Sequence, residues 1–380
     1  PDRRPMLTQQ FVEWCKTANV ADRCYGVELL ADAVTEQKFL PAQTREAEAA
    51  LLIALDDPSP RVRRTIADRV AASDRVPREL VRRLVRDADE IAVPVVERSP
   101  LLEANDLIAL AADGRPALAT ALASRADLDA TVASALVEAE APVCLELIAN
   151  HSARIDDADL RRLANRWGED ARLRDALLRR DDLPTDARHQ LLGRLAGDLC
   201  ASPFVANIVG TGRAVALERE LRERATSALV ELLEGPDLPS FVEYLRDARQ
   251  LHTALLVRAV CGGRIDFFAA AVSRLSGMPE RRVHAVVADA HEPAFHALMA
   301  VSGVSPPAIP LLLSAVRVWK SMADGPELDH EAMATAVVER VSLRFRGERD
   351  FGDLAQLLHR LGVEAQSALA RRRVGRHLAA

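Results

Sequence analysis

The sequence predicts an all-α protein made of antiparallel helix pairs, and three observations support this. Hydrophobic residues make up 49% of the 380 residues, but aromatic residues make up only 4%. Small and branched aliphatic side chains therefore dominate, which favours helix packing over a sheet. Apolar residues recur every third or fourth position in blocks of roughly 10–16 residues, and short turns with Pro, Asp or Ser separate the blocks.

The clearest helix pair lies in residues 51–70. An apolar run ends one helix, and Asp57 and Ser59 can then cap the next. Pro60 suits the first position of that helix, because the amide hydrogen that proline lacks has no partner there. The face predicted to be buried contains Val62, Ile66 and Val70. This order of helix, tight turn and helix recurs along the chain.

Short internal echoes indicate an array of repeats. The segment 87–93 is echoed by 289–295, and the segment 124–128 is echoed by 179–183. In the second case an Asp-Leu step leads each time into a new apolar block. The echoes are brief and unevenly spaced, as expected when each repeat contacts only its neighbours and preserves only its packing face.

One part of this pattern resembles the HEAT repeat, in which an acid precedes the second helix of a pair and an arginine follows inside it. The matching residues are Leu55, Asp57, Val62, Arg63 and Ala67. In such an arrangement Asp57 can satisfy free amides at the helix start and pair with an arginine of an adjacent repeat. The resemblance implies a HEAT-like α-solenoid, that is, an α-α superhelix.

The wider pattern resembles an uncharacterised bacterial family, known mainly from alphaproteobacteria, that carries a helical domain of unknown function. The residues that carry this resemblance are 99–102, 147–150 and 179–184. The resemblance covers most of residues 50–300. It implies neither an activity nor a cofactor.

The chain changes character near residue 200. We expect a HEAT-like array over 6–200, a linker or hinge over 201–212, and a C-terminal helical region over 213–380; a continuous superhelix is the alternative. The last region should begin with a long amphipathic helix over 213–234. Its apolar seam is predicted to contain Leu217, Leu221, Ala225, Ala228 and Leu232.

The segment Gly210-Thr211-Gly212-Arg213 is a weak candidate for anion binding. It opens a helix after the strand-like run 204–209, and free amides, glycine flexibility and an arginine suit an anion. The dinucleotide fingerprint, however, needs a small residue where Val215 stands, and no Walker lysine is present. A flexible hinge is the favoured interpretation.

The sequence gives little support for a metal site or a catalytic site. His284, His291 and His296 cluster in sequence, but the last two are about 140° apart around a helix and cannot point at one ion. No nucleophile elbow or placed Cys–His pair is found. We therefore expect no catalytic residue, metal or cofactor. The five scattered cysteines favour a reducing cytoplasm over a disulfide framework.

An arginine-rich segment is the best candidate surface. Residues 61–86 contain nine arginines and three acids, although five flanking acids bring the charge of the wider segment to +1. An ordinary solvated face is the competing interpretation. Three of the arginines recur every fourth residue on one helix face. The candidate partner-binding residues are Arg64, Arg75, Arg78, Arg82 and Arg86.

These observations favour a non-catalytic helical-repeat scaffold or adaptor with a regulatory role, which binds a partner protein in the groove of the array. The net charge of −6 disfavours a dedicated nucleic-acid binder. A nucleic-acid-binding HEAT-like protein that uses the arginine-rich helix face is the alternative. No uninterrupted apolar run of about 18 residues predicts a membrane span.

Overall fold

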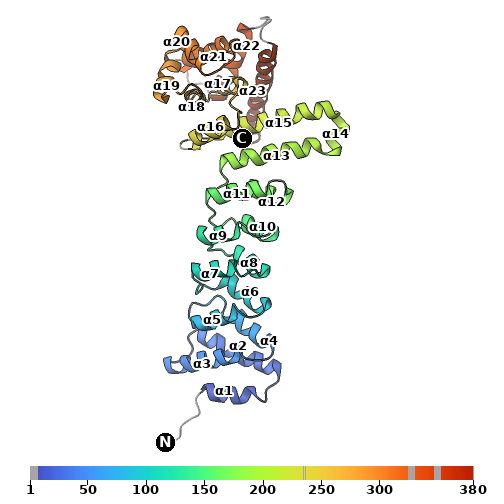
Figure 1. Ribbon diagram of the computed structural model, residues 1–380, viewed down its shortest axis with the longest axis vertical. Helices are drawn as coiled ribbons and strands as arrows, with labels where there is room; N and C mark the ends of the chain where they lie inside the picture. Colours follow the sequence, from blue (N-terminus) through green and yellow to red (C-terminus); the bar gives the residue numbers. More distant parts are fainter. Residues whose placement is uncertain (1–6, 234, 236, 324–329, 346–351, 380) are drawn as a thin grey trace. The chain divides into compact units, whose positions relative to one another are not determined.

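The computed structural model describes residues 7–233, 235, 237–323, 330–345 and 352–379, and these form helices without a single strand (Figure 1). The all-α prediction is confirmed for this part of the chain. None of its helices is long and apolar enough to cross a membrane. The chain divides into two compact units, Pro1–Ala187 and Arg188–Ala380.

The first unit is a succession of short helices. They are α1 (Leu7–Cys15), α2 (Val20–Thr35), α3 (Pro41–Ala54), α4 (Pro60–Val70), α5 (Arg78–Leu84), α6 (Asp89–Arg98), α7 (Ala104–Ala111), α8 (Pro116–Ala123), α9 (Ala130–Leu136), α10 (Ala141–Ala149), α11 (Asp157–Trp167) and α12 (Ala171–Leu178). Each even-numbered helix contacts the next even-numbered one, from α2 through α12. Between them lie fully buried aliphatic side chains, which include Val62, Ile66, Leu80, Ile91 and Leu122.

A line of Asp–Arg pairs connects the turns of the first helices. Asp57 accepts a hydrogen bond from the backbone amide of Ser59 at 2.8 Å and binds Arg23 of α2 through both carboxylate oxygens, at 2.7 and 3.2 Å. Arg63 of α4 binds Asp87 of the next turn in the same way, at 2.7 and 3.1 Å. Asp57 therefore pairs with an arginine of another helix, as expected, but it binds the amide of Ser59 just before α4, and the side chain of Ser59 makes no capping hydrogen bond.

A second link explains the echo between 124–128 and 179–183. Arg125 is 2% exposed; it binds both oxygens of Asp127 and donates to the carbonyl oxygens of Val96 at 2.7 Å and Ser99 at 3.1 Å. Because an arginine carries five donors in a rigid fork, one side chain can hold a turn closed and bind the preceding helix end. We call this arrangement the Arg-x-Asp clamp.

The same clamp recurs at Arg180, which is also 2% exposed. It binds Asp182 at 2.8 and 2.7 Å. It also donates to the carbonyl oxygens of Ile148 at 3.1 Å, Asn150 at 2.9 Å and Ala153 at 3.1 Å. The residues that carried the family resemblance thus include both donors and acceptors of these clamps.

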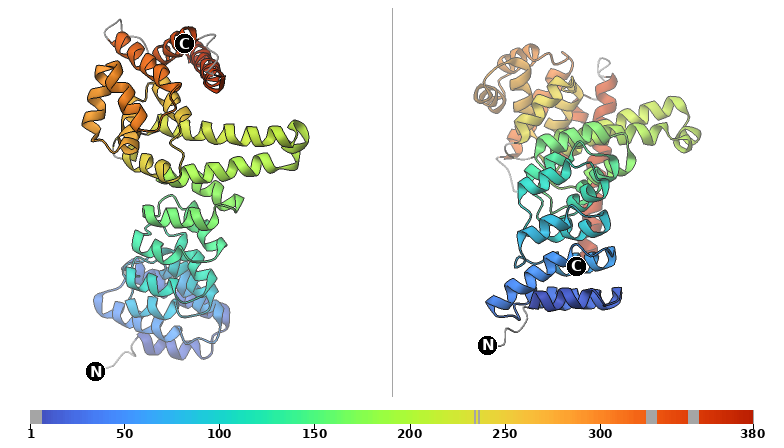
Figure 2. Two further views of the ribbon diagram at one scale, coloured as in Figure 1. Left: turned by 45° about the horizontal axis from the view of Figure 1, so that its top comes forward. Right: turned by 60° about the horizontal axis from the view of Figure 1, so that its bottom comes forward.

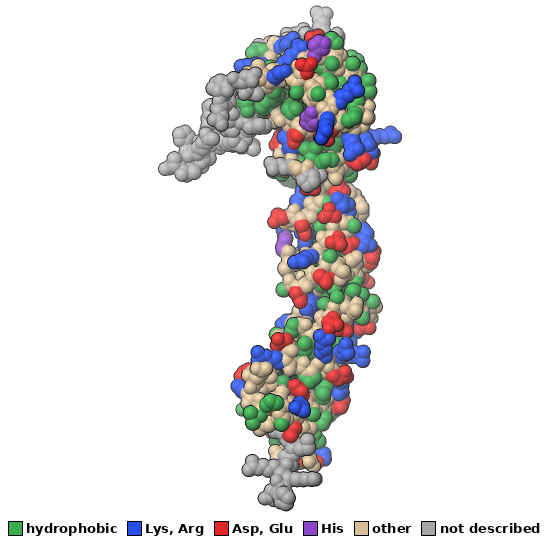
Figure 3. Space-filling model, turned by 90° about the vertical axis from the view of Figure 1, so that its left-hand side faces the viewer, with side chains coloured by type: hydrophobic (Ala, Val, Ile, Leu, Met, Phe, Trp, Pro, Cys, Tyr) green, Lys and Arg blue, Asp and Glu red, His purple; other side chains and the backbone are tan. Residues whose placement is uncertain are grey.

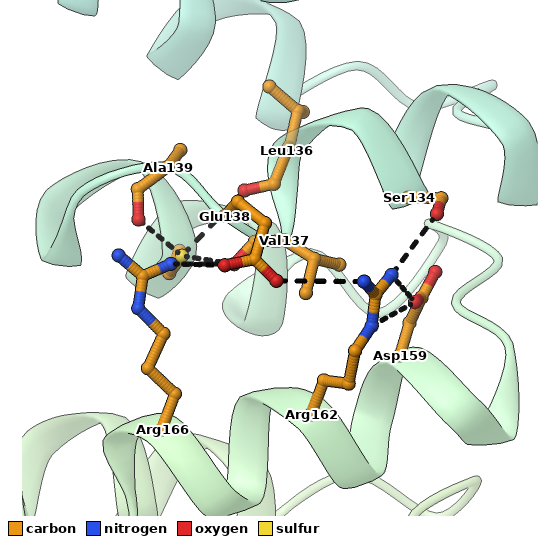
Figure 4. Close-up of polar contacts among 9 residues, drawn as sticks. Ser134, Leu136, Val137, Glu138, Ala139, Asp159, Arg162 and Arg166 are labelled. Carbon is orange, nitrogen blue, oxygen red and sulfur yellow. Dashed lines mark hydrogen bonds and ion pairs between the residues drawn. The ribbon is translucent and has the colours of Figure 1, made fainter.

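Helices α9 and α11 are linked by a different pairing (Figure 4). Glu138, just after α9, lies 3.6 Å from Arg162 and 3.5 Å from Arg166 of α11. Arg166 also donates to the carbonyl oxygen of Val137 at 3.1 Å. The first unit is therefore held together by polar contacts at helix ends as well as by its apolar core.

The second unit contains longer helices. α13 (Thr185–Ala201) enters it, and α14 (Pro203–Val209), α15 (Thr211–Leu232), α16 (Asp237–Asp247), α17 (Thr253–Cys261), α18 (Ile265–Ser276), α19 (Glu280–Asp289), α20 (Glu292–Val301), α21 (Ala308–Ala323), α22 (His330–Arg344) and α23 (Gly352–Ala379) follow. Helices α13 and α15 lie side by side and are joined by α14 (Figures 1 and 2). The run 204–209, which could pass for a strand, is helical.

The apolar seam predicted for α15 is wrong at its C-terminal end. Leu232 is 79% exposed, and Ala228 is exposed as well. The buried positions are instead Thr226, Ser227, Leu229 and Val230. The two hydroxyl groups can be buried because each donates to the carbonyl oxygen four residues earlier, at 2.9 Å in both cases. A pattern of apolar residues in the sequence does not predict such positions, where a polar side chain is buried because it bonds to the backbone of its own helix.

The second unit also contains an Arg-x-Asp clamp. Arg264 binds both oxygens of Asp266, at 3.0 and 2.8 Å, and donates to the carbonyl oxygens of Val230 and Leu233 at the end of α15. Beside it, Phe267 and Phe268 are fully buried in a large apolar core. Clamps of this kind therefore occur within each of the two units.

Candidate functional site

The predicted arginine stripe lies on α5 only in part, because α5 ends at Leu84 and Arg86 follows it in the turn before α6. Arg78 pairs with Glu103, whereas Arg82 and Arg86 are exposed and have no ion-pair or hydrogen-bond partner among the described residues. Leu80, Val81 and Leu84 bury the opposite side of this short helix. The packing of α5 thus leaves the unpaired guanidinium group of Arg82 in solvent, and that of Arg86 is exposed in the following turn.

The other two candidate arginines belong to different environments. Arg64 lies on α4, where it binds Asp68 at 2.9 Å and donates to the carbonyl oxygen of Glu90. Arg75 lies in the turn before α5, 3.8 Å from Asp74. The structure connects neither of them to the stripe on α5.

Most of the charge of the arginine-rich segment is neutralised by ion pairs. Six of its nine arginines have acidic partners: Arg63, Arg64, Arg69, Arg75, Arg78 and Arg83. Only Arg61, Arg82 and Arg86 have none within the described chain. Figure 3 shows the result, with cationic and anionic side chains interspersed along the first unit. The candidate surface is therefore smaller than the sequence suggests and centres on two residues.

The glycine-rich segment lies at the start of α15. Gly210 precedes the helix with φ +81°, a conformation that favours glycine, while Gly212 and Arg213 are exposed within the first turn. None of the three lines either cavity described below. The backbone geometry accounts for Gly210 as the residue that turns the chain from α14 into α15.

Within the described part of the chain, His284, His291 and the cysteines do not come together in a metal site. His284 lies 3.5 Å from Glu280 on the same helix, and His291 precedes α20. The described residues contain no group of three or more His, Cys, Asp or Glu that could hold a metal ion. Burial raises the pKa of the Cys261 thiol to about 12, which makes it unreactive near neutral pH.

A cleft of about 370 Å³ in the second unit was missed by sequence reasoning. One side is a face of α15, where Val215, Arg219, Arg222 and Thr226 succeed one another at helical spacing. The other side is formed by Gln250, His252, Ala254, Leu255 and Arg258, and Leu357 of α23 contributes a third wall. Since three distant segments meet here, no local motif could have indicated the cleft.

The cleft combines cationic and apolar groups. Arg222 lies 2.7 Å from Glu218 and Arg219 lies 3.2 Å from Glu223, both as i,i+4 pairs on exposed arginines. Such pairs contribute only about 0.3–0.5 kcal/mol, so an incoming anion can compete for them. Arg258 is more enclosed, with a side chain 13% exposed and bound to Glu364 at 2.5 Å.

His252 adds a hydrogen-bond donor to the cleft wall. Its Nδ1 accepts from the backbone amide of Leu255 at 3.2 Å, so the neutral ring carries its proton on Nε2. Partial desolvation lowers the pKa of His252; Glu223 opposes this shift and Arg219 reinforces it. The ring is therefore neutral near pH 7 and can donate from Nε2.

A neighbouring cavity of about 220 Å³ is lined by His189, Tyr244, Arg222 and Gln250. Thr226 donates to the carbonyl oxygen of Arg222, so its oxygen accepts from Nε2 of His189 at 2.8 Å. Nδ1 of His189 then accepts from the hydroxyl of Tyr244 at 3.2 Å. Burial lowers the pKa of His189, and Arg222 lowers it further. This network holds a neutral histidine between Thr226 and Tyr244.

Comparison with known proteins gives a family but no relative with an activity. Residues 91–348 match the family model described as "Uncharacterised protein conserved in bacteria (DUF2336)". No curated protein and no solved structure matches the chain.

Proposed function

The chain belongs to this bacterial family, whose description names no activity, and from its surface we propose that it is a non-catalytic helical-repeat scaffold that binds an acidic segment of a partner protein. The scaffold would act as a regulator or an adaptor. It would recognise its partner protein by shape and charge, with no covalent step. The free state of the five cysteines suits a reducing compartment, so the proposal places the protein in the cytoplasm.

The proposed architecture is a HEAT-like α-solenoid. Its support is the regular contact from each even-numbered helix to the next, together with the Asp57 and Asp87 pairs that join successive turns. Solenoids of this kind stack short helix pairs that contact only their neighbours, which creates long surfaces suited to binding extended partners.

The observation that carries the proposed function is the isolation of Arg82 and Arg86. Arginines that stabilise this fold have carboxylate or carbonyl partners, as Arg63 and Arg83 do. The side chains of Arg82 and Arg86 have neither among the described residues; Arg82 lies on α5, whose other face is buried, and Arg86 is exposed in the turn that follows. Two guanidinium groups four residues apart are suited to bidentate contacts with carboxylates of a partner.

The test is charge reversal with a matched control. The full chain carrying Arg82→Glu and Arg86→Glu should lose a specific partner in a quantitative pull-down from the native bacterium. A chain carrying Arg172→Glu and Arg179→Glu should retain it, because these exposed arginines are also unpaired among the described residues but lie on or just after α12. The purified partner should then bind the wild-type chain with an affinity that decreases as salt increases.

Two results would overturn the proposal. Equal loss in both double variants, or retention in both, would exclude the stripe on α5 as the recognition surface. A mobility shift of DNA or RNA at low salt that requires Arg82 and Arg86 and declines steeply with added salt would instead establish the nucleic-acid alternative.

A further inference from the structure

The geometry points to a second binding site, in the cleft between α15, α17 and α23, for a small organic anion that has an apolar body. The cleft volume of about 370 Å³ lies within the range of small-molecule sites. All of its lining residues belong to the second unit, so the inference is independent of the partner surface proposed on α5.

The charged side of the cleft selects for an anion. Three arginines line the cleft, Arg219, Arg222 and Arg258, and each has one glutamate partner, so an anion would bind to the guanidinium donors that these pairs leave free. Arg222 makes a single described ion pair, with Glu218, although a guanidinium carries five N–H donors. The Nε2–H of His252 and the amide of Gln250 add neutral donors. A carboxylate or phosphate can therefore bind without displacing a buried ion pair.

The apolar side of the cleft selects for a hydrocarbon body. Leu255 and Leu357 are 4% and 3% exposed, and they line the cleft together with Val215 and Ala254. Val215 is 69% exposed, so a bound hydrocarbon would cover an apolar side chain that otherwise faces water. An inorganic anion alone would leave this side unused, which is why we assign an amphipathic ligand.

The test uses octanoate and octyl phosphate as probes, with octylamine and acetate as comparisons, added to the full-length chain below micellar concentrations. Calorimetry or ligand-observed NMR should show saturable binding of the two anionic octyl probes. For ligands with about ten heavy atoms, dissociation constants in the millimolar range or below are expected. Octylamine lacks the anion and acetate lacks the body, so both should bind at least about tenfold more weakly.

A matched pair of variants localises the site. Arg222 and Arg246 both lie in the second unit, are 53% and 39% exposed, and each binds a glutamate of its own helix, Glu218 at 2.7 Å and Glu243 at 3.4 Å. Of the two, Arg222 lines the cleft and Arg246 does not. Arg222→Gln should weaken probe binding about tenfold or more, whereas Arg246→Gln should leave it unchanged.

A variant that fills the cleft tests the apolar side. Ala254→Leu extends a half-buried lining residue into the cavity and should reduce binding of octanoate and octyl phosphate alike, with retained helix content as evidence of folding. Absence of saturable binding by both octyl anions would overturn the inference. So would equal binding of octylamine, or an equal loss in Arg222→Gln and Arg246→Gln. None of these results bears on Arg82 and Arg86.

Discussion

Replacement of Arg180 by methionine tests whether the Arg-x-Asp clamp stabilises the first unit. Methionine keeps an unbranched apolar stem but removes the donors to three backbone carbonyl oxygens and to Asp182. A buried acceptor left without a donor costs about 1–3 kcal/mol, and two of the three carbonyl contacts are fully buried. The Asp182 pair adds little because that side chain is 50% exposed. We expect a loss of about 3–5 kcal/mol in the free energy of unfolding.

The assay is urea unfolding followed by circular dichroism, with hydrogen exchange of α10 and α12 to localise the loss. Arg179→Met is the control, because its side chain is exposed and has no described partner; it should lie within about 0.5 kcal/mol of the wild type. Asp182→Asn should cost less than Arg180→Met. If Arg180→Met destabilises by under 1 kcal/mol, or if Asp182→Asn costs as much, the carbonyl contacts are not the source of stability.

Two further predictions concern titration and the turn ladder. Burial lowers the pKa of His189 below 6.5, so the folded state favours the neutral ring. The free energy of unfolding should therefore decline as pH falls below about 6.5, by up to about 1.4 kcal/mol per pH unit. Melting temperatures measured between pH 7 and 5 should decline less in His189→Phe than in the wild type, and an identical slope would contradict the assignment. Asp87→Ala removes both the bidentate pair with Arg63 and the acceptor for the amide of Ala88. It should lower the free energy of unfolding in urea by about 2–4 kcal/mol. The exposed control Glu79→Ala should lower it by under about 0.5 kcal/mol.

Much of the helical organisation can be predicted from local residues. Pro60 begins α4, and Val62, Ile66 and Val70 are fully buried on it, because turn chemistry and apolar period act over a few residues. The echo at 124–128 and 179–183 was recognised, but its cause was not. Arg125 and Arg180 act on carbonyl groups more than 25 residues away, which no local pattern reveals.

The candidate sites were harder to predict, since charge in sequence does not show which ions find partners. Arg64 and Arg82 look equivalent in sequence, yet one binds Asp68 and the other has no described partner. The cleft depends on residues as distant as Val215 and Leu357, so it needs the tertiary fold. The prediction of the apolar seam on α15 was wrong for the same reason, because packing against neighbouring helices buries Thr226 and Ser227 and leaves Leu232 exposed.

The Arg-x-Asp clamp has a consequence for how such chains change length during evolution. Each clamp is encoded in one short turn and acts on the backbone, so it recognises a helix end whatever side chains that end carries. Excision of residues 126–180 would place Arg125 directly before Asp181 and Asp182, which recreates the same three-residue turn beside its original acceptors. Recombination at these turns can therefore add or remove whole helix pairs and still leave an intact Arg-x-Asp turn at the junction.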